Sequence, residues 1–123
     1  MSYNWGPHYI VPTPSLREYS GNVRLREELN EDLLVKELDK LGFSGSSIVR
    51  ITNPWYFRRK GTSTWIKIGE SDNKEENFPV LWETATLENG QYEILGLMHV
   101  SIKKGNKTYS IARENVAEVT VAN

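Results

Sequence analysis

Apolar and polar residues alternate along much of this chain, and this alternation predicts strands. It is longest over residues 91–103, where every second position is apolar or glycine: Tyr92, Ile94, Gly96, Met98, Val100 and Ile102. Residues 104–107, Lys-Gly-Asn-Lys, then carry a hairpin signal, and apolar residues recur from Tyr109 to Val121. We therefore expect a long two-stranded hairpin in the C-terminal part of the chain.

At Asn30 the spacing of apolar residues changes from the period of a strand to the period of a helix. Three leucines fall on one helix face at i, i+4 and i+7: Leu34, Leu38 and Leu41. Asn30 is a good N-cap, and Gly42 is a good residue to follow the last turn. These signals predict a helix over about residues 31–41, within an insert at 30–43, whose leucine stripe covers the core.

The other predicted strands are short and are separated by turns. They lie at residues 9–16, 23–29, 47–59, 64–69 and 78–83, with a bend expected at Asn53-Pro54. Many short strands with frequent turns favour an antiparallel sandwich over a parallel sheet. We expect one sandwich domain at residues 9–123, with the helix capping one end and with residues 1–8 forming a flexible N-terminal segment.

Composition narrows the classes of protein to which this chain can belong. Its 123 residues suit one domain with one core. It contains no cysteine, which excludes disulfides and thiolate chemistry, and no apolar run long enough to cross a bilayer. The net charge of −1 argues against a general nucleic-acid binder. The first residues show no signal-peptide pattern.

A spaced motif occupies residues 78–94: Trp82-Glu83-Thr84, Leu87, Gly90 and Tyr92. It resembles the W-D-T-x-x-L-x-x-G-x-Y stretch of bacterial Ig-like and fibronectin type III-like surface modules, with glutamate in place of aspartate. In such a corner Gly90 can adopt a positive φ, and Leu87 plugs the core below it. The hydroxyl of Tyr92 can then donate back to the upstream backbone, as in a tyrosine corner.

Three further segments, at residues 20–25, 65–69 and 119–123, resemble other strands of the same modules. Together these resemblances cover most of the chain except the first eight residues and the helix. They imply an all-β, Ig-like or fibronectin III-like β-sandwich of about seven strands with one inserted α-helix. The helix is a departure from the pattern of the family.

Four tryptophans are the most conspicuous candidates for ligand contact: Trp5, Trp55, Trp65 and Trp82. Exposed tryptophans stack on sugar rings, because both partners offer a flat apolar face. Trp65 and Trp82 match structural positions of the resembled modules and are expected in the core. Trp55 follows the Asn53-Pro54 break, so Trp55 and its neighbour Tyr56 are the candidate ligand-binding residues.

The sequence contains no complete catalytic or metal-binding motif. The chain contains no nucleophile elbow and no glycine-rich phosphate loop. The acid-rich stretch at residues 70–76 lacks EF-hand spacing, and two histidines are too few for a catalytic zinc site. We therefore expect no enzymatic activity, no metal and no cofactor.

These expectations favour a non-enzymatic Ig-like module of a surface or extracellular protein. Such a module acts as a spacer, an adhesion unit or a protein-binding unit, and it can form homo-oligomers. A carbohydrate-binding accessory module that uses exposed aromatic residues is the alternative. The expected partner is a protein or a polysaccharide, without nucleic-acid binding or membrane insertion.

Overall fold

The structure is a computed structural model that describes residues 19–123. Its elements are β1 (Asn22–Leu25), α1 (Glu31–Lys40), β2 (Ile48–Arg59), β3 (Ile66–Ser71), β4 (Val80–Glu83), β5 (Gly90–Lys104) and β6 (Lys107–Val121), with the 3-10 turns η1 (Gly45–Ser47) and η2 (Lys74–Glu76). The predicted flexible segment at residues 1–8 and the predicted strand at residues 9–16 lie outside the described residues.

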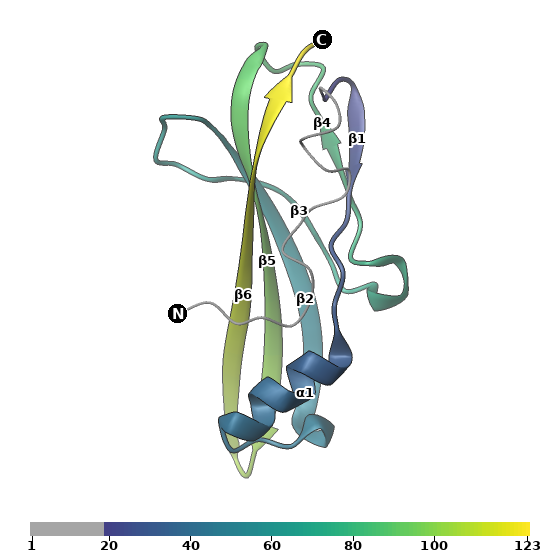
Figure 1. Ribbon diagram of the computed structural model, residues 1–123, viewed down its shortest axis with the longest axis vertical. Helices are drawn as coiled ribbons and strands as arrows, with labels where there is room; N and C mark the ends of the chain where they lie inside the picture. The colour runs from purple at the N-terminus through teal and green to yellow at the C-terminus, as the bar shows by residue number, and fades with distance from the viewer. Residues whose placement is uncertain (1–18) are drawn as a thin grey trace.

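The strands form two antiparallel sheets (Figure 1). One sheet has four strands in the order β3-β2-β5-β6, and the other pairs β1 with β4. The prediction of a mostly β, sandwich-like architecture is confirmed at this level. Residues 19–123 contribute six of the expected strands.

The hairpin of β5 and β6 contains the two longest strands of the described residues. β5 and β6 pair without a break in register from Gly90 and Val121 to Lys104 and Lys107. The two-residue turn between them places Gly105 at a φ of 63°, which glycine adopts without strain. The alternating apolar positions of β5 all face inward and are buried, as the period of two predicts.

The helix forms where the sequence predicts it. The side-chain oxygen of Asn30 accepts from the backbone N–H of Leu33 at 3.2 Å and caps the first turn. At the other end Gly42 adopts a φ of 86°, and the N–H of Phe43 donates to the carbonyl of Leu38 at 2.8 Å. This is the Schellman arrangement, and it ends the helix at Lys40, one residue before the end of the predicted range.

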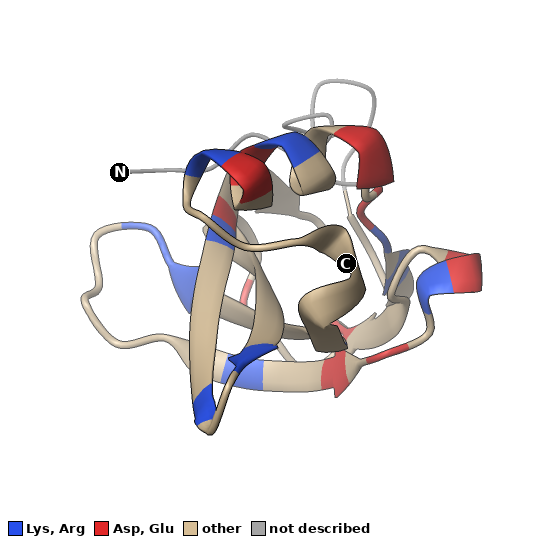
Figure 2. Cartoon of the chain, turned by 90° about the horizontal axis from the view of Figure 1, so that it is seen from below, with Lys and Arg blue, Asp and Glu red and all other residues tan. Residues whose placement is uncertain are grey.

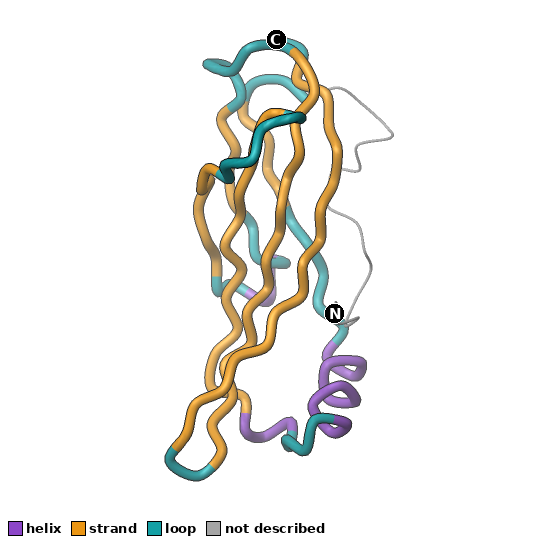
Figure 3. The backbone as a smooth tube through the Cα atoms, turned by 90° about the vertical axis from the view of Figure 1, so that its left-hand side faces the viewer, coloured by secondary structure: helices purple, strands orange, loops and turns teal. Residues whose placement is uncertain are grey.

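The helix and the small sheet share the work of covering the four-stranded sheet. β1 and β4 lie over one half of it, while α1 lies over the other half, near the β5–β6 turn (Figures 1 and 3). Leu34 and Leu38 are buried against β5, whereas Leu41, the third member of the predicted stripe, stays 40% exposed. The helix therefore extends the second layer along the sheet instead of closing an end.

The core is divided into two clusters. The upper cluster, under β1 and β4, consists of Tyr19, Val23, Leu25, Trp55, Trp82, Tyr92, Ile94, Val119 and Val121. The lower cluster, under α1, consists of Leu34, Leu38, Phe78, Met98, Val100 and Ile102. Buried polar side chains separate the two clusters, which lie on one shared sheet, so the core of this domain has two parts.

β2 is irregular, but not where the sequence suggests. Its pairing with β5 keeps one register from Thr52 to Trp55, across the predicted bend at Asn53-Pro54. The irregularities fall instead next to Val49, on the β5 side, and between Trp55 and Tyr56, on the β3 side. β3 pairs with β2 only over residues 53–57, so the first part of β2 extends beyond it.

Candidate functional site

Trp55 lies inside the molecule. Its side chain is 0% exposed, and its indole N–H donates to the backbone carbonyl of Phe78 at 3.0 Å. Phe78 itself has a φ of 54°, which is unusual for an aromatic residue, and its N–H donates to the carbonyl of Asn73 at 2.9 Å. A stacking platform must be accessible, so the prediction of a ligand-binding Trp55 is wrong. The hydrogen bond of its indole instead holds the loop before β4 against β2.

Tyr56 lies on the opposite, outer face of the four-stranded sheet, since successive side chains of a strand alternate. It is partly exposed and lies between Lys67 of β3 and Leu95 of β5 across the sheet. Trp65 is partly exposed and belongs to neither core cluster, so the expectation of a core position for it is wrong. The guanidinium of Arg58 covers its ring at 4.1 Å from the centroid. The structure therefore separates the two predicted ligand residues onto opposite faces of β2.

The four corner residues meet in and around the upper cluster. Trp82 is buried, and Leu87 packs against the same cluster. The hydroxyl of Tyr92 donates to the carbonyl of Glu88 at 2.7 Å, which is the upstream hydrogen bond that the sequence predicts. Gly90 has a φ of 148°, a conformation that other residues rarely adopt. These contacts give the corner residues a structural role in the upper cluster.

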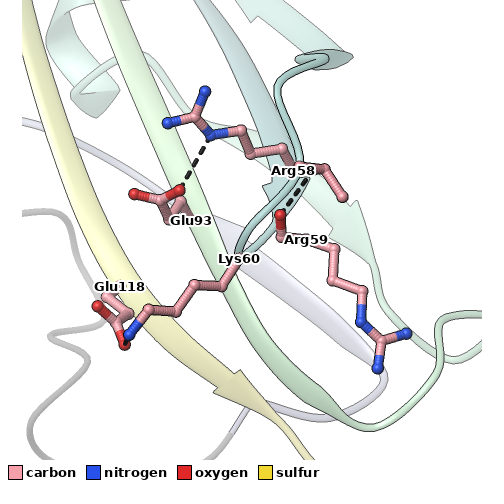
Figure 4. A network of polar contacts seen from close by, with 6 residues as sticks. Arg58, Arg59, Lys60, Glu93 and Glu118 are labelled. Atoms are coloured by element: carbon pink, nitrogen blue, oxygen red, sulfur yellow. Dashed lines mark hydrogen bonds and ion pairs between the residues drawn. The ribbon is translucent and has the colours of Figure 1, made fainter.

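The basic run at the end of β2 is neutralised by acidic residues (Figure 4). Arg58 pairs with Glu93 at 2.9 Å, and Lys60 pairs with Glu118 at 2.8 Å, in each case across strands of the same sheet. The third cation of the run, Arg59, pairs with Glu88. The carboxylate of Glu118 raises the pKa of Lys60, and that of Glu88 raises the pKa of Arg59.

A buried polar belt separates the two core clusters, and the sequence analysis did not predict it. It consists of four side chains that are at most 4% exposed: Glu27, Asn53, Arg113 and Asn115. Glu27 lies in the connection between β1 and α1, and its carboxylate forms an ion pair with Arg113 of β6. Arg113 also donates to the carbonyl of Glu28 at 3.1 Å. The arginine thus ties this connection to the sheet.

Gly96 makes room for the belt. It faces inward at the centre of β5, between Trp55 of β2 and Asn115 of β6. A Cβ atom at this position would lie 1.7 Å from Oε2 of Glu27 and 3.2 Å from the Trp55 ring. The carboxylate therefore occupies the space that a side chain would fill in an ordinary strand.

The belt is electrostatically costly. Burial raises the pKa of the Glu27 carboxyl, and its attraction to Arg113 and its hydrogen bond with Arg113 offset this only in part. Within residues 19–123, five buried side-chain atoms lack a hydrogen-bond partner: Glu27 Oε2, Asn53 Oδ1, Arg113 Nε, Arg113 Nη1 and Asn115 Nδ2. Each such atom costs about 1–3 kcal/mol. A buried ion pair in this setting is weak evidence for added stability, because the cost of removing both charges from water can exceed their mutual attraction.

A sequence signal for the belt exists in retrospect. β6 alternates apolar residues on its inner face, but Arg113 and Asn115 interrupt them where the period demands apolar side chains. Gly96 interrupts β5 at the position that pairs with Asn115. Interruptions at facing positions of two long strands therefore mark a buried polar contact. Its partner Glu27 comes from another layer and has no signal in the local pattern.

The described residues bear on two further features, a metal site and a membrane-spanning helix. Within residues 19–123, no three His, Asp or Glu side chains gather closely enough to hold a metal ion. Acidic residues of the acid-rich stretch at residues 70–76 contact cations of the chain itself, as Glu76 does with Arg24 at 3.2 Å. No helix in this part of the chain is long and apolar enough to cross a membrane. His8 and Trp5 lie outside the described residues.

Comparison of the chain with known protein families, with curated proteins and with solved structures finds no match.

Proposed function

We propose that this chain is a non-enzymatic Ig-like module that serves as a spacer and protein-binding unit of a surface or extracellular protein. The strand order carries the proposal. In Ig-type sandwiches strands C, F and G share one sheet, B pairs with E in the other, and variable-type domains add C′ to the first sheet. Taking β1 to β6 as B, C, C′, E, F and G reproduces every one of these pairings.

Two side chains support this assignment. Ig domains carry a buried tryptophan on strand C and a tyrosine corner near the start of strand F. Trp55 is buried on β2, and Tyr92 makes its corner hydrogen bond at the start of β5. Both residues stand where the assignment requires them.

The way in which the chain enters and leaves the sandwich supports the role of spacer. Tyr19 pairs with Val121 in parallel, so the chain passes through both residues in the same direction. The N–H of Tyr19 donates to the carbonyl of Thr120 at 2.8 Å, and the N–H of Ala122 donates to the carbonyl of Tyr19 at 2.9 Å. Tension between the two ends loads both hydrogen bonds at once, in shear. Bonds loaded together resist more force than bonds that open one at a time.

Single-molecule pulling tests the role of spacer. The chain has no cysteine, so one engineered cysteine defines each attachment point. Pulling between the two ends of the chain should require a clearly higher unfolding force than pulling between Gln91→Cys and the C-terminus. The second geometry separates β5 from β6 from one end, because Gln91 pairs with Thr120. Equal forces in the two geometries, or a lower force between the chain ends, would refute the role of spacer.

A further inference from the structure

The first part of β2 forms a free strand edge. β5 pairs with β2 along one side from Ile48 onward, but β3 covers the other side only over residues 53–57. Within residues 19–123, no strand pairing or loop hydrogen bond is made on that side by residues 48–52, which we call the free edge. Figure 3 shows the sheet continuing towards α1 beyond the end of β3. Unpaired backbone N–H and C=O groups at such an edge are a template for another strand.

An apolar pocket lies beside the free edge. It has a volume of about 270 Å³ and lies between α1, η1 and β2. Its lining consists of Leu34, Val35, Gly45, Ile48 and Ile51, together with a charged pair, Glu31 and Lys74. The ammonium of Lys74 lies 2.6 Å from the carboxylate of Glu31. We call this space the edge pocket, and its size suits one or two aliphatic side chains.

A strand that paired with the free edge would also contact the edge pocket. Ile48 and Ile51 belong to the free edge and point inward to the pocket, because the irregularity at Val49 restores their common face. A strand added beside residues 48–52 would direct its own inward side chains to the same place. Val35 remains 45% exposed at this point of α1, so apolar surface is left uncovered.

The charge beside the free edge adds a second element of specificity. Arg50 lies on the outward face of β2, is exposed, and makes no ion pair with another residue of 19–123. After the hydrogen bond from Lys67, its charge also helps to lower the pKa of Glu70 on β3, so this side of the sheet attracts carboxylates near Arg50. Figure 2 shows the charges of α1, which are of both signs along the helix. A carboxylate opposite Arg50 on a neighbouring strand is a favourable cross-strand pair.

We propose that the free edge binds an extended segment of a partner protein, antiparallel to β2 and in line with β3. The segment places an aliphatic side chain opposite Ile51, in the edge pocket, and an acidic side chain opposite Arg50. Five paired residues span about 17 Å. The backbone supplies affinity and the alternate side chains supply specificity, as in other cases of strand addition. This inference rests on the proposed role as a protein-binding module.

A second copy of the chain fits this edge poorly. Two-fold pairing of residues 48–52 with themselves is centred on Arg50 and places the two guanidinium groups opposite each other. Like charges directly opposite are destabilising in a sheet. The partner is therefore a different chain that carries the carboxylate.

Selection from a displayed library of random heptapeptides tests the proposal. Peptides enriched on the wild-type protein should contain an aliphatic residue next to an acidic one. Val35→Glu places a carboxylate in the edge pocket and should weaken the selected peptides by about tenfold or more, since the buried aliphatic side chain is lost. Val116→Glu is the matched control, because Val116 is 49% exposed on β6, and it should leave binding unchanged.

Fold and chemistry are checked separately. Circular dichroism and the urea midpoint establish that Val35→Glu and Val116→Glu remain folded. Arg50→Glu should reverse the preference of the selected peptides from acidic to basic residues. N-methylation of the peptide at successive positions should abolish binding at alternate residues only, because alternate N–H groups of an added strand point at β2.

Hydrogen exchange locates the bound peptide. Binding should slow exchange of those amides of residues 48–52 that point away from β5. No enrichment of peptides, equal binding to Val35→Glu, or slowed exchange at β6 instead would each overturn the proposal, and so would self-association through residues 48–52. The pulling experiment is independent of this edge. A retained difference in unfolding force with no peptide binding refutes only this inference, whereas loss of both refutes the module itself.

Discussion

The upper and lower halves of the molecule share one sheet but are covered in different ways. In the upper half two four-residue strands, β1 and β4, lie over the sheet, and the cluster between them is rich in aromatic rings. In the lower half α1 lies over the same strands, and the cluster is mainly aliphatic. The ring of Trp82 packs edge to face with the rings of Tyr19 and Tyr92, with centroids 6.2 Å apart in each pair.

The length of the strands explains the change of cover. β5 and β6 have fifteen residues each and extend about 50 Å, whereas β1 and β4 extend about 14 Å. A short pair of strands cannot cover so long a sheet, so the rest of its apolar face needs another layer. The helix supplies that layer, and Glu27 lies in the connection where one cover gives way to the other. The polar belt thus marks the boundary between two ways of burying the same strands.

Of the changes considered, disruption of the Glu27–Arg113 pair in the polar belt should have the largest effect on the free energy of unfolding. Arg113→Met leaves the buried carboxylate of Glu27 without its partner and should reduce the free energy of unfolding by about 3–5 kcal/mol. Replacing both partners, with Glu27→Met in addition, should recover most of this loss, because no unpaired charge then remains. Urea denaturation measures both variants. A double variant as unstable as Arg113→Met would show that the pair has a role beyond mutual neutralisation.

The pH dependence of stability should report the burial of Glu27. Its pKa is raised in the folded protein, so the folded state binds its proton more tightly than the unfolded state does. Its contribution is then fully present below the ordinary pKa of glutamate and is lost as the pH rises through the raised value. The stability of the wild-type protein relative to Glu27→Gln should therefore fall as the pH rises above the ordinary pKa of glutamate and through the raised pKa of Glu27.

This difference between variants isolates Glu27 from groups that behave in the opposite way. The pKa of Glu70 is lowered by its hydrogen bond with Lys67, so its contribution is lost as the pH falls. Both proteins contain Glu70, and its effect cancels in the comparison. A wild-type advantage that grows with pH would mean that attraction to Arg113 outweighs burial.

Tyr92→Phe should weaken the upper half alone. It removes the 2.7 Å hydrogen bond to the carbonyl of Glu88 and should cost about 1 kcal/mol in the free energy of unfolding. Tyr56→Phe is the matched control, because its hydroxyl makes no hydrogen bond within the described residues. Chemical denaturation of both variants checks the prediction, and equal losses would argue against a stabilising corner.

Asn30→Ala should weaken the lower half, by the smallest amount. The side chain of Asn30 caps α1 through Leu33, and loss of such a cap costs about 0.5–1 kcal/mol. Asn30→Asp keeps a capping oxygen and should restore stability. Hydrogen exchange should become faster in α1 and remain unchanged in β1 and β4. Equal acceleration in all three elements would show that the two halves open as one unit.

The candidate ligand residues illustrate what an alternating pattern leaves open. Trp55 and Tyr56 are adjacent, so a strand necessarily directs them to opposite faces. Which of the two faces becomes buried depends on the layer packed against β2, and that layer comes from distant parts of the chain. The sequence therefore predicts that one of the pair is hidden but not which one. The local sequence does not predict the free edge either, because the free edge depends on where β3 ends relative to β2.

Local signals alone determined the hairpin, the helix with both of its caps, and the corner at Tyr92. Each depends on residues that lie close together in the sequence, so period, capping chemistry and turn glycines suffice to specify it. Tertiary structure alone decided the split core, the Glu27–Arg113 pair and the position of α1 as a second layer. These features join residues as far as 86 positions apart. A carboxylate becomes a buried ion pair only when another strand delivers its partner, and no local pattern carries that information.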